Sequence, residues 1–99
     1  MVRDLGRQHD IPTMAYGHAG DGNFHVWAIY KLDDEETWSR AVTINEAVVD
    51  FAIGAGGTCT AEHGIGLGKR KFLPREHASS LAAMRRVKQM FDPKGILNP

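Results

Sequence analysis

Two imidazoles and a carboxylate lie within the eight residues 18–25, which read HAGDGNFH. His18, Asp21 and His25 offer the nitrogen and oxygen donors that divalent metals bind. The glycines between them are costly inside a helix, but they reach backbone angles that other residues avoid. The segment therefore predicts a tight loop between two strands, where a ligand can approach the backbone.

A second cluster, EHGIG at 62–66, begins 37 positions after His25 and likewise combines a carboxylate and an imidazole with glycines. If the two loops meet, His18, His25 and Glu62 present two nitrogens and one oxygen. That set suits zinc, manganese or iron with open coordination positions, and it leaves His63 and Asp21 as groups that either support the ligands or take part in catalysis. The alternative is that these side chains never meet, since neither cluster matches a short zinc signature such as HExxH.

Residues 64–69, GIGLGK, have the glycine content of a phosphate-binding loop. Their glycine spacing differs from the Walker A and dinucleotide patterns, and Arg70 stands where Walker A has Ser or Thr. We interpret the basic run 69–71 as a solvated turn, with Lys69 as a candidate contact for a substrate or partner carboxylate.

The elements that must position these loops follow from composition and periodicity. Runs rich in β-formers predict three strands in one antiparallel sheet, at 11–17, 24–31 and 57–61. Apolar residues at helical spacing predict helices at 35–53 and 74–91, which cover one face of the sheet. Asp33 is the expected N-cap of the first of these helices. The second strand is expected to be well buried, with Trp27 and Trp38 in the core.

The composition limits the classes of function. Ninety-nine residues make one domain at most, and twelve basic against twelve acidic residues argue against nucleic-acid binding through the overall field. Cys59 is the only cysteine, so no intrachain disulfide forms and a reducing compartment is the simpler assumption. No apolar run approaches the ~20 residues of a transmembrane helix. We expect a cytoplasmic protein that contacts a membrane only peripherally, through partners.

Three segments occur together in this chain: GHAGDGNFH at 17–25, CTAEHGIGLGKRKFL at 59–73 and FDPKGILNP at 91–99. In this order they resemble the C-terminal part of the FAD-linked oxidases. That family includes D-lactate dehydrogenase, the glycolate oxidase flavin subunit and D-2-hydroxyglutarate dehydrogenase. The resemblance covers residues 1–99 as a partial domain, without the FAD-binding domain that precedes this region in full-length members. Ala61 stands where the family usually has glycine, and Trp27 where several members have asparagine.

The resemblance implies oxidation of a small 2-hydroxy acid, of the D-lactate or glycolate type, to a 2-oxo acid with hydride transfer to FAD. It assigns His18, His25 and Glu62 as ligands of a divalent metal, zinc or manganese. It assigns His63 as the base and Asn23 as a cofactor-side contact. FAD would be held mainly by a flavin-binding domain or subunit, so we expect no turnover from the isolated 99-residue chain.

The fold expected from both arguments is α+β, a ferredoxin-like antiparallel sheet with helices on one face, as a fragment of that C-terminal domain. The leading function is the catalytic, substrate-side part of an FAD-dependent 2-hydroxy-acid dehydrogenase. A stand-alone metal- or carboxylate-binding module without redox activity and a small metal hydrolase are the alternatives. A flavin-binding partner would cover part of the surface of this chain. In the isolated chain we therefore expect an exposed apolar patch or a homo-oligomer.

Overall fold

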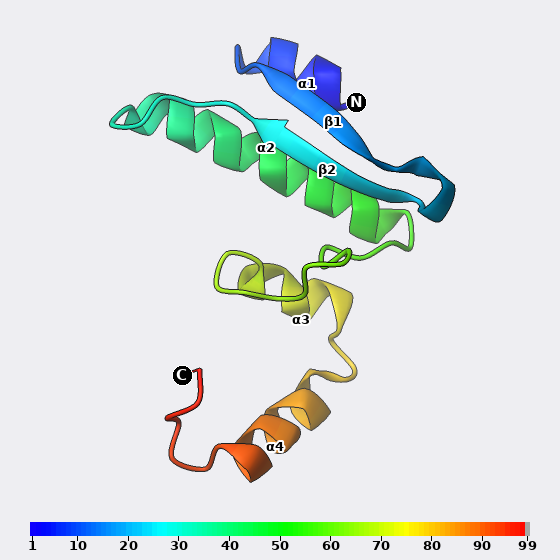
Figure 1. The fold of residues 1–99 in the computed structure, drawn as a ribbon, viewed down its shortest axis with the longest axis vertical. Helices are drawn as coiled ribbons and strands as arrows, with labels where there is room; N and C mark the ends of the chain where they lie inside the picture. The colour runs from blue at the N-terminus through cyan, green and yellow to red at the C-terminus, as the bar shows by residue number, and fades with distance from the viewer. Residues whose placement is uncertain (99) are drawn as a thin grey trace. The chain divides into compact units, whose positions relative to one another are not determined.

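The computed structural model describes residues 1–98 of the chain. The chain divides into two compact units, the first Met1–Gly64 and the second from Ile65 onward. Figure 1 shows the strands and the longest helix in the first unit, and only short helices in the second.

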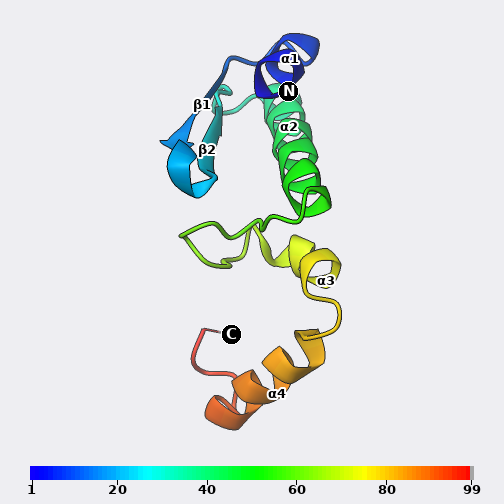
Figure 2. The ribbon, with the colours of Figure 1, turned by 90° about the vertical axis from the view of Figure 1, so that its right-hand side faces the viewer.

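The first unit is a β-hairpin packed against helices. Its elements in order are α1 (Val2–Gln8), β1 (Thr13–His18), β2 (Asn23–Ala28) and α2 (Glu35–Gly54). The strands pair antiparallel, with Tyr16 opposite His25 and His18 opposite Asn23. Figure 2 shows α2 running along the hairpin and α1 beside the first turns of α2.

The core of the first unit lies mainly along α2. Ala41, Ile44 and Val49 are buried there, and Ile44 is completely enclosed. Their spacing follows the helical period, so they form one stripe of the helix. Ile11, just before β1, and Cys59, after α2, are also buried. This small core holds the hairpin by one face only.

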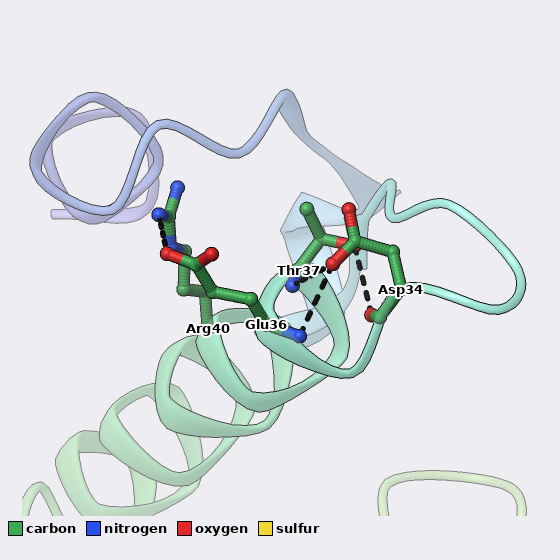
Figure 3. A network of polar contacts seen from close by, with 4 residues as sticks. All are labelled: Asp34, Glu36, Thr37 and Arg40. Carbon is green, nitrogen blue, oxygen red and sulfur yellow. Dashed lines mark hydrogen bonds and ion pairs between the residues drawn. The ribbon is translucent and has the colours of Figure 1, made fainter.

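Asp34 begins α2 as its N-cap (Figure 3). Its Oδ1 atom accepts hydrogen bonds from the backbone N–H groups of Thr37, at 3.0 Å, and Glu36, at 3.1 Å. These bonds satisfy donors that the first helical turn leaves unpaired, and they lower the pKa of Asp34. The predicted cap, Asp33, is wrong by one residue, because its φ of +66° places it in the turn before the helix.

The second unit contains a 3-10 turn, η2 (Arg70–Phe72), and two helices, α3 (Leu73–Glu76) and α4 (Leu81–Phe91). The single helix predicted over 74–91 is therefore wrong, because it is interrupted between α3 and α4. Ser80 lies at the break, where its Oγ donates to the carbonyl of His77 at 3.4 Å. Such local side-chain bonds compete with helical ones.

Asp92 closes the end of α4. Its carboxylate accepts backbone N–H bonds from Ile96, at 2.7 Å, and Leu97, at 3.0 Å, and pairs with Lys88. The hydrogen bond from Lys88 is the main reason that the pKa of Asp92 is lowered. The turn after the helix is thus tied back to its last turn.

The α+β class and the two predicted strands at 11–17 and 24–31 are confirmed, but the third strand at 57–61 is wrong. Those residues are irregular in the described chain, and the sheet has two strands. Oγ1 of Thr58 lies 2.9 Å from Oγ1 of Thr60. It also accepts a hydrogen bond from the backbone N–H of Thr60 at 3.2 Å. The threonines therefore bond locally instead of serving a neighbouring strand.

The expected burial of the second strand is also wrong. Trp27 in β2 is 53% exposed, and Trp38 in α2 is 51% exposed. Successive side chains of a strand point to opposite faces, and helices cover only one face of this hairpin. Trp38 instead packs at the surface against Tyr30, with ring centroids 4.8 Å apart.

Candidate metal centre

The hairpin turn fixes the first two donors. A 3-10 turn (Ala19–Asp21) and Gly22, with φ of +66°, join His18 at the end of β1 to Asn23 at the start of β2. Gly17 allows the strands to approach closely, because a Cβ there would lie 2.2 Å from the carbonyl oxygen of Asn23. The turn therefore holds His18 and Asn23 opposite each other.

Alternation along the strands places Tyr16, His18, Asn23 and His25 on one face of the hairpin. The rings of His18 and His25 lie 6.3 Å apart, nearly perpendicular. Tyr16 stacks on His25 with ring centroids 5.0 Å apart and an angle of 24° between the planes. His25 is half-buried by this contact and its neighbours, so its ring is held while His18 stays exposed.

Glu62 reaches this face from the segment after α2. Its Oε2 accepts a hydrogen bond from Nδ2 of Asn23 at 3.0 Å, and its Oε1 lies 3.3 Å from Nε2 of His25. Glu62 lies within a tight turn, in which the N–H of His63 donates to the carbonyl of Thr60 at 3.0 Å. The turn lets two successive side chains, Glu62 and His63, face the same cluster.

His18, His25 and Glu62 each offer one ligand atom, and these atoms lie within 4.8 Å of one another. Donors that share one ion at about 2.1 Å lie roughly 3–4 Å apart, so modest rotations of the exposed His18 and Glu62 complete such a site. One carboxylate and two neutral imidazoles suit a divalent ion. The three residues fit a metal, and their role as ligands stays a prediction.

His63 stands next to this group. Its ring centroid is 5.3 Å from that of His25, and its Nε2 lies 3.5 Å from Oε1 of Glu62. The side chain is exposed and is not one of the three converging donors. Asp21 lies in the hairpin turn and does not join them either. His63 therefore borders the three converging donors, and its role as the base stays a prediction.

Sequence reasoning missed two contacts of the cluster, the stacking of Tyr16 on His25 and the hydrogen bond from Asn23 to Glu62. The two-residue period of a strand could have placed Tyr16 and Asn23 on the face of the predicted ligands, but it gives no signal for the contact with Glu62. Tyr16 precedes His18 by two positions and Asn23 precedes His25 by two, so each shares a face with a predicted ligand. A cofactor contact by Asn23 stays a prediction.

Comparison with known proteins matches residues 1–99 to the family described as FAD linked oxidases, C-terminal domain. The chain is 51% identical over 88 residues, 88% of its length, to the mitochondrial D-lactate dehydrogenase [cytochrome] of Kluyveromyces lactis. It is 34% identical over 99 residues, 99% of its length, to glycolate oxidase subunit GlcD of Bacillus subtilis. It is 34% identical over 93 residues, 91% of its length, to D-2-hydroxyglutarate dehydrogenase of Stutzerimonas stutzeri.

The chain spans 15%, 21% and 20% of the lengths of these three relatives, respectively. Within residues 1–98, no helix combines the length and the apolar character needed to cross a bilayer.

Proposed function

Because the chain belongs to the family of FAD-linked oxidase C-terminal domains, we propose that it forms the substrate side of an FAD-dependent 2-hydroxy-acid dehydrogenase. The names of its relatives specify D-lactate, glycolate and D-2-hydroxyglutarate, which are all 2-hydroxy acids. The proposed reaction oxidises a small acid of the D-lactate or glycolate type to its 2-oxo acid.

The observation that carries the proposal is the convergence of His18, His25 and Glu62 on one face of the hairpin. These residues would hold a divalent ion, zinc or manganese. When bound, such an ion supplies Lewis-acid chemistry that binds the hydroxyl and carboxylate of the substrate and lowers the hydroxyl pKa. The FAD of the family supplies the acceptor for the hydride from C2.

His63 would take the hydroxyl proton as a neutral imidazole. Its Nε2 faces Oε1 of Glu62 at 3.5 Å, which favours the ring proton on that nitrogen. The lone pair for the substrate proton is then on Nδ1. Tyr16 stacks on His25 and restricts the orientation of its ring. Because the His25 ring faces both Glu62 and His63, this stacking supports the proposed position of His63.

The proposal requires a flavin-binding domain or subunit as partner, with Asn23 as a contact on the cofactor side. The family membership supports such a partner. We propose a cytoplasmic location with peripheral membrane contact through partners, although some relatives are named mitochondrial.

The test is reduction of flavin in the full protein assembled with its flavin-binding partner. Each of D-lactate, glycolate and D-2-hydroxyglutarate is added without oxygen, and the flavin absorbance is followed. We expect at least one acid to bleach the flavin, chelator treatment to stop this, and added manganese or zinc to restore it. Failure of every small 2-hydroxy acid to bleach a correctly loaded flavin would contradict the proposed function.

A metal-binding module without redox activity is the second candidate. It is favoured by one observation, that all three converging donors belong to this chain. Metal uptake would then require no flavin partner. The flavin experiment separates the two, because a module of this kind binds metal but reduces no flavin with any of the acids.

A further inference from the structure

We propose that Asn23 is a positioning residue that assigns one oxygen of Glu62 to the metal and withholds the other. The inference rests on the proposed metal centre and specifies how its carboxylate is oriented. Its basis is the hydrogen bond from Nδ2 of Asn23 to Oε2 of Glu62, at 3.0 Å, between residues 39 positions apart.

The two oxygens of Glu62 have different surroundings. Oε1 faces Nε2 of His25 at 3.3 Å and Nε2 of His63 at 3.5 Å, so it points into the group of donors. Oε2 is occupied by the amide of Asn23. The carboxylate is therefore oriented so that it would give a bound ion one oxygen, and coordination positions would remain for the hydroxyl and carboxylate of a 2-hydroxy acid.

Asn23 is well suited to fix this orientation. It is the first residue of β2 and is paired with His18 in the strand register, so its backbone is held beside a predicted ligand. Reversing its amide would put Oδ1 against Oε2 of Glu62, which brings two acceptors together. The amide therefore has one favourable orientation, with Nδ2 toward the carboxylate.

The other end of the amide supports the same reading. Oδ1 of Asn23 is buried and has no hydrogen-bond partner among the residues that the structure describes. A buried acceptor without a partner is unfavourable, so this side chain is not explained by local stability alone. Within the described residues, the one hydrogen bond that the structure gives this amide is the bond from Nδ2 to Glu62, which we take as its function.

The experiment compares Asn23→Leu with Asn45→Leu in the full protein. Leucine has the same branched shape as asparagine but no donor, and Asn45 lies exposed on α2. Manganese binding is measured by calorimetry without substrate. We expect Asn23→Leu to weaken manganese binding about 10- to 100-fold, the usual effect of losing a group that orients a ligand, and Asn45→Leu to leave it unchanged. Cobalt bound in place of manganese should also change its visible spectrum only in Asn23→Leu.

A double-mutant cycle tests whether Asn23 acts through Glu62. With Glu62→Gln as background, an oxygen remains for the metal but the side-chain NH2 stands against Nδ2 of Asn23, so we expect Asn23→Leu to cause little further loss of affinity. Circular dichroism and thermal unfolding check the fold, and Asn23→Ala replaces Asn23→Leu in the cycle if the larger apolar side chain prevents folding.

Two results would overturn the inference and are distinguishable from each other. Wild-type manganese affinity in Asn23→Leu or Asn23→Ala, or equal losses in the Glu62 and Glu62→Gln backgrounds, would refute the role of Asn23 while leaving the metal centre intact. No manganese, zinc or cobalt binding by the unaltered protein would refute the metal centre and this inference together.

Discussion

At the scale of single residues, we propose different roles for two neighbouring side chains in the turn after α2. Glu62 points an oxygen at His25, while His63 lies beside the same oxygen and remains exposed. A ligand and a base can therefore come from consecutive positions, because the turn lets both face the hairpin. Replacing Glu62 should therefore affect metal binding, whereas replacing His63 should affect turnover.

His63→Gln should lower turnover of the flavin-loaded protein by about 10²- to 10⁴-fold, because the substrate proton loses its acceptor. Manganese affinity should stay the same, since His63 is not one of the three converging donors. Turnover and calorimetry on the same preparation measure the two effects, with His9→Gln as the control. Loss of manganese binding in His63→Gln would show that His63 is a ligand.

Ala61, directly before Glu62, has a φ of +43°. Alanine is disfavoured in this left-handed region, where glycine is not, so Ala61→Gly should stabilise the protein by about 1 kcal/mol. The matched control is Ala55→Gly, because Ala55 has a φ of −84° and should gain nothing. Urea unfolding measures the free energy of unfolding of both variants. A loss of stability in both variants would mean that the turn holding Glu62 is unstrained.

At the scale of elements, α2 carries most of the buried side chains of the first unit, so its start matters for the hairpin. The pKa of Asp34 is lowered by the backbone bonds that it accepts from Thr37 and Glu36. A lowered pKa in the folded state means that the carboxylate stabilises the fold above the unfolded value of 3.8 and loses this effect as pH falls through the folded value.

Asp34→Ala should therefore lower the thermal midpoint at neutral pH by about 4 °C, as the loss of an N-cap does in a small domain. The difference from the unaltered protein should narrow as the pH falls below 3.8. Asp34→Asn should retain the cap, and Asp33→Asn controls for the change in charge. A difference that is constant down to acid pH would rule out the carboxylate as the cap.

The same elements show what the sequence could predict. The hairpin strands and α2 were predictable because their periodicity and turn residues agree locally. The prediction of a strand at 57–61 was wrong because Thr58 and Thr60 bond to each other. The donor types of the site were also readable from the sequence. The hydrogen bond from Asn23 to Glu62 joins segments 39 positions apart and depends on packing that no local pattern specifies.

At the scale of the whole chain, both units expose large apolar side chains. No residue of α4 is buried, and Met90 and Phe91 are 76% and 73% exposed. Trp27 is exposed in the first unit, on the side of β2 that carries the site. Apolar surface of this kind is typical of contacts with other protein, and we interpret these residues as a contact surface.

The chain expressed without a flavin partner should therefore self-associate. Light scattering over a range of protein concentrations measures this, and replacing Met90 and Phe91 by lysine should reduce the association. The double replacement Arg85→Lys and Arg86→Lys, on the same helix, is the control because it retains the charge. A monomer at every concentration would contradict the interpretation of these residues as a contact surface.

The central claim, that His18, His25 and Glu62 hold one divalent ion, is tested most directly by metal stoichiometry. The protein is dialysed against manganese or zinc, and bound metal is measured by atomic absorption in the unaltered chain, His25→Ala and His63→Ala. The account predicts one ion per chain in the unaltered protein and in His63→Ala, and none in His25→Ala. Metal retained by His25→Ala, or lost from His63→Ala alone, would contradict it.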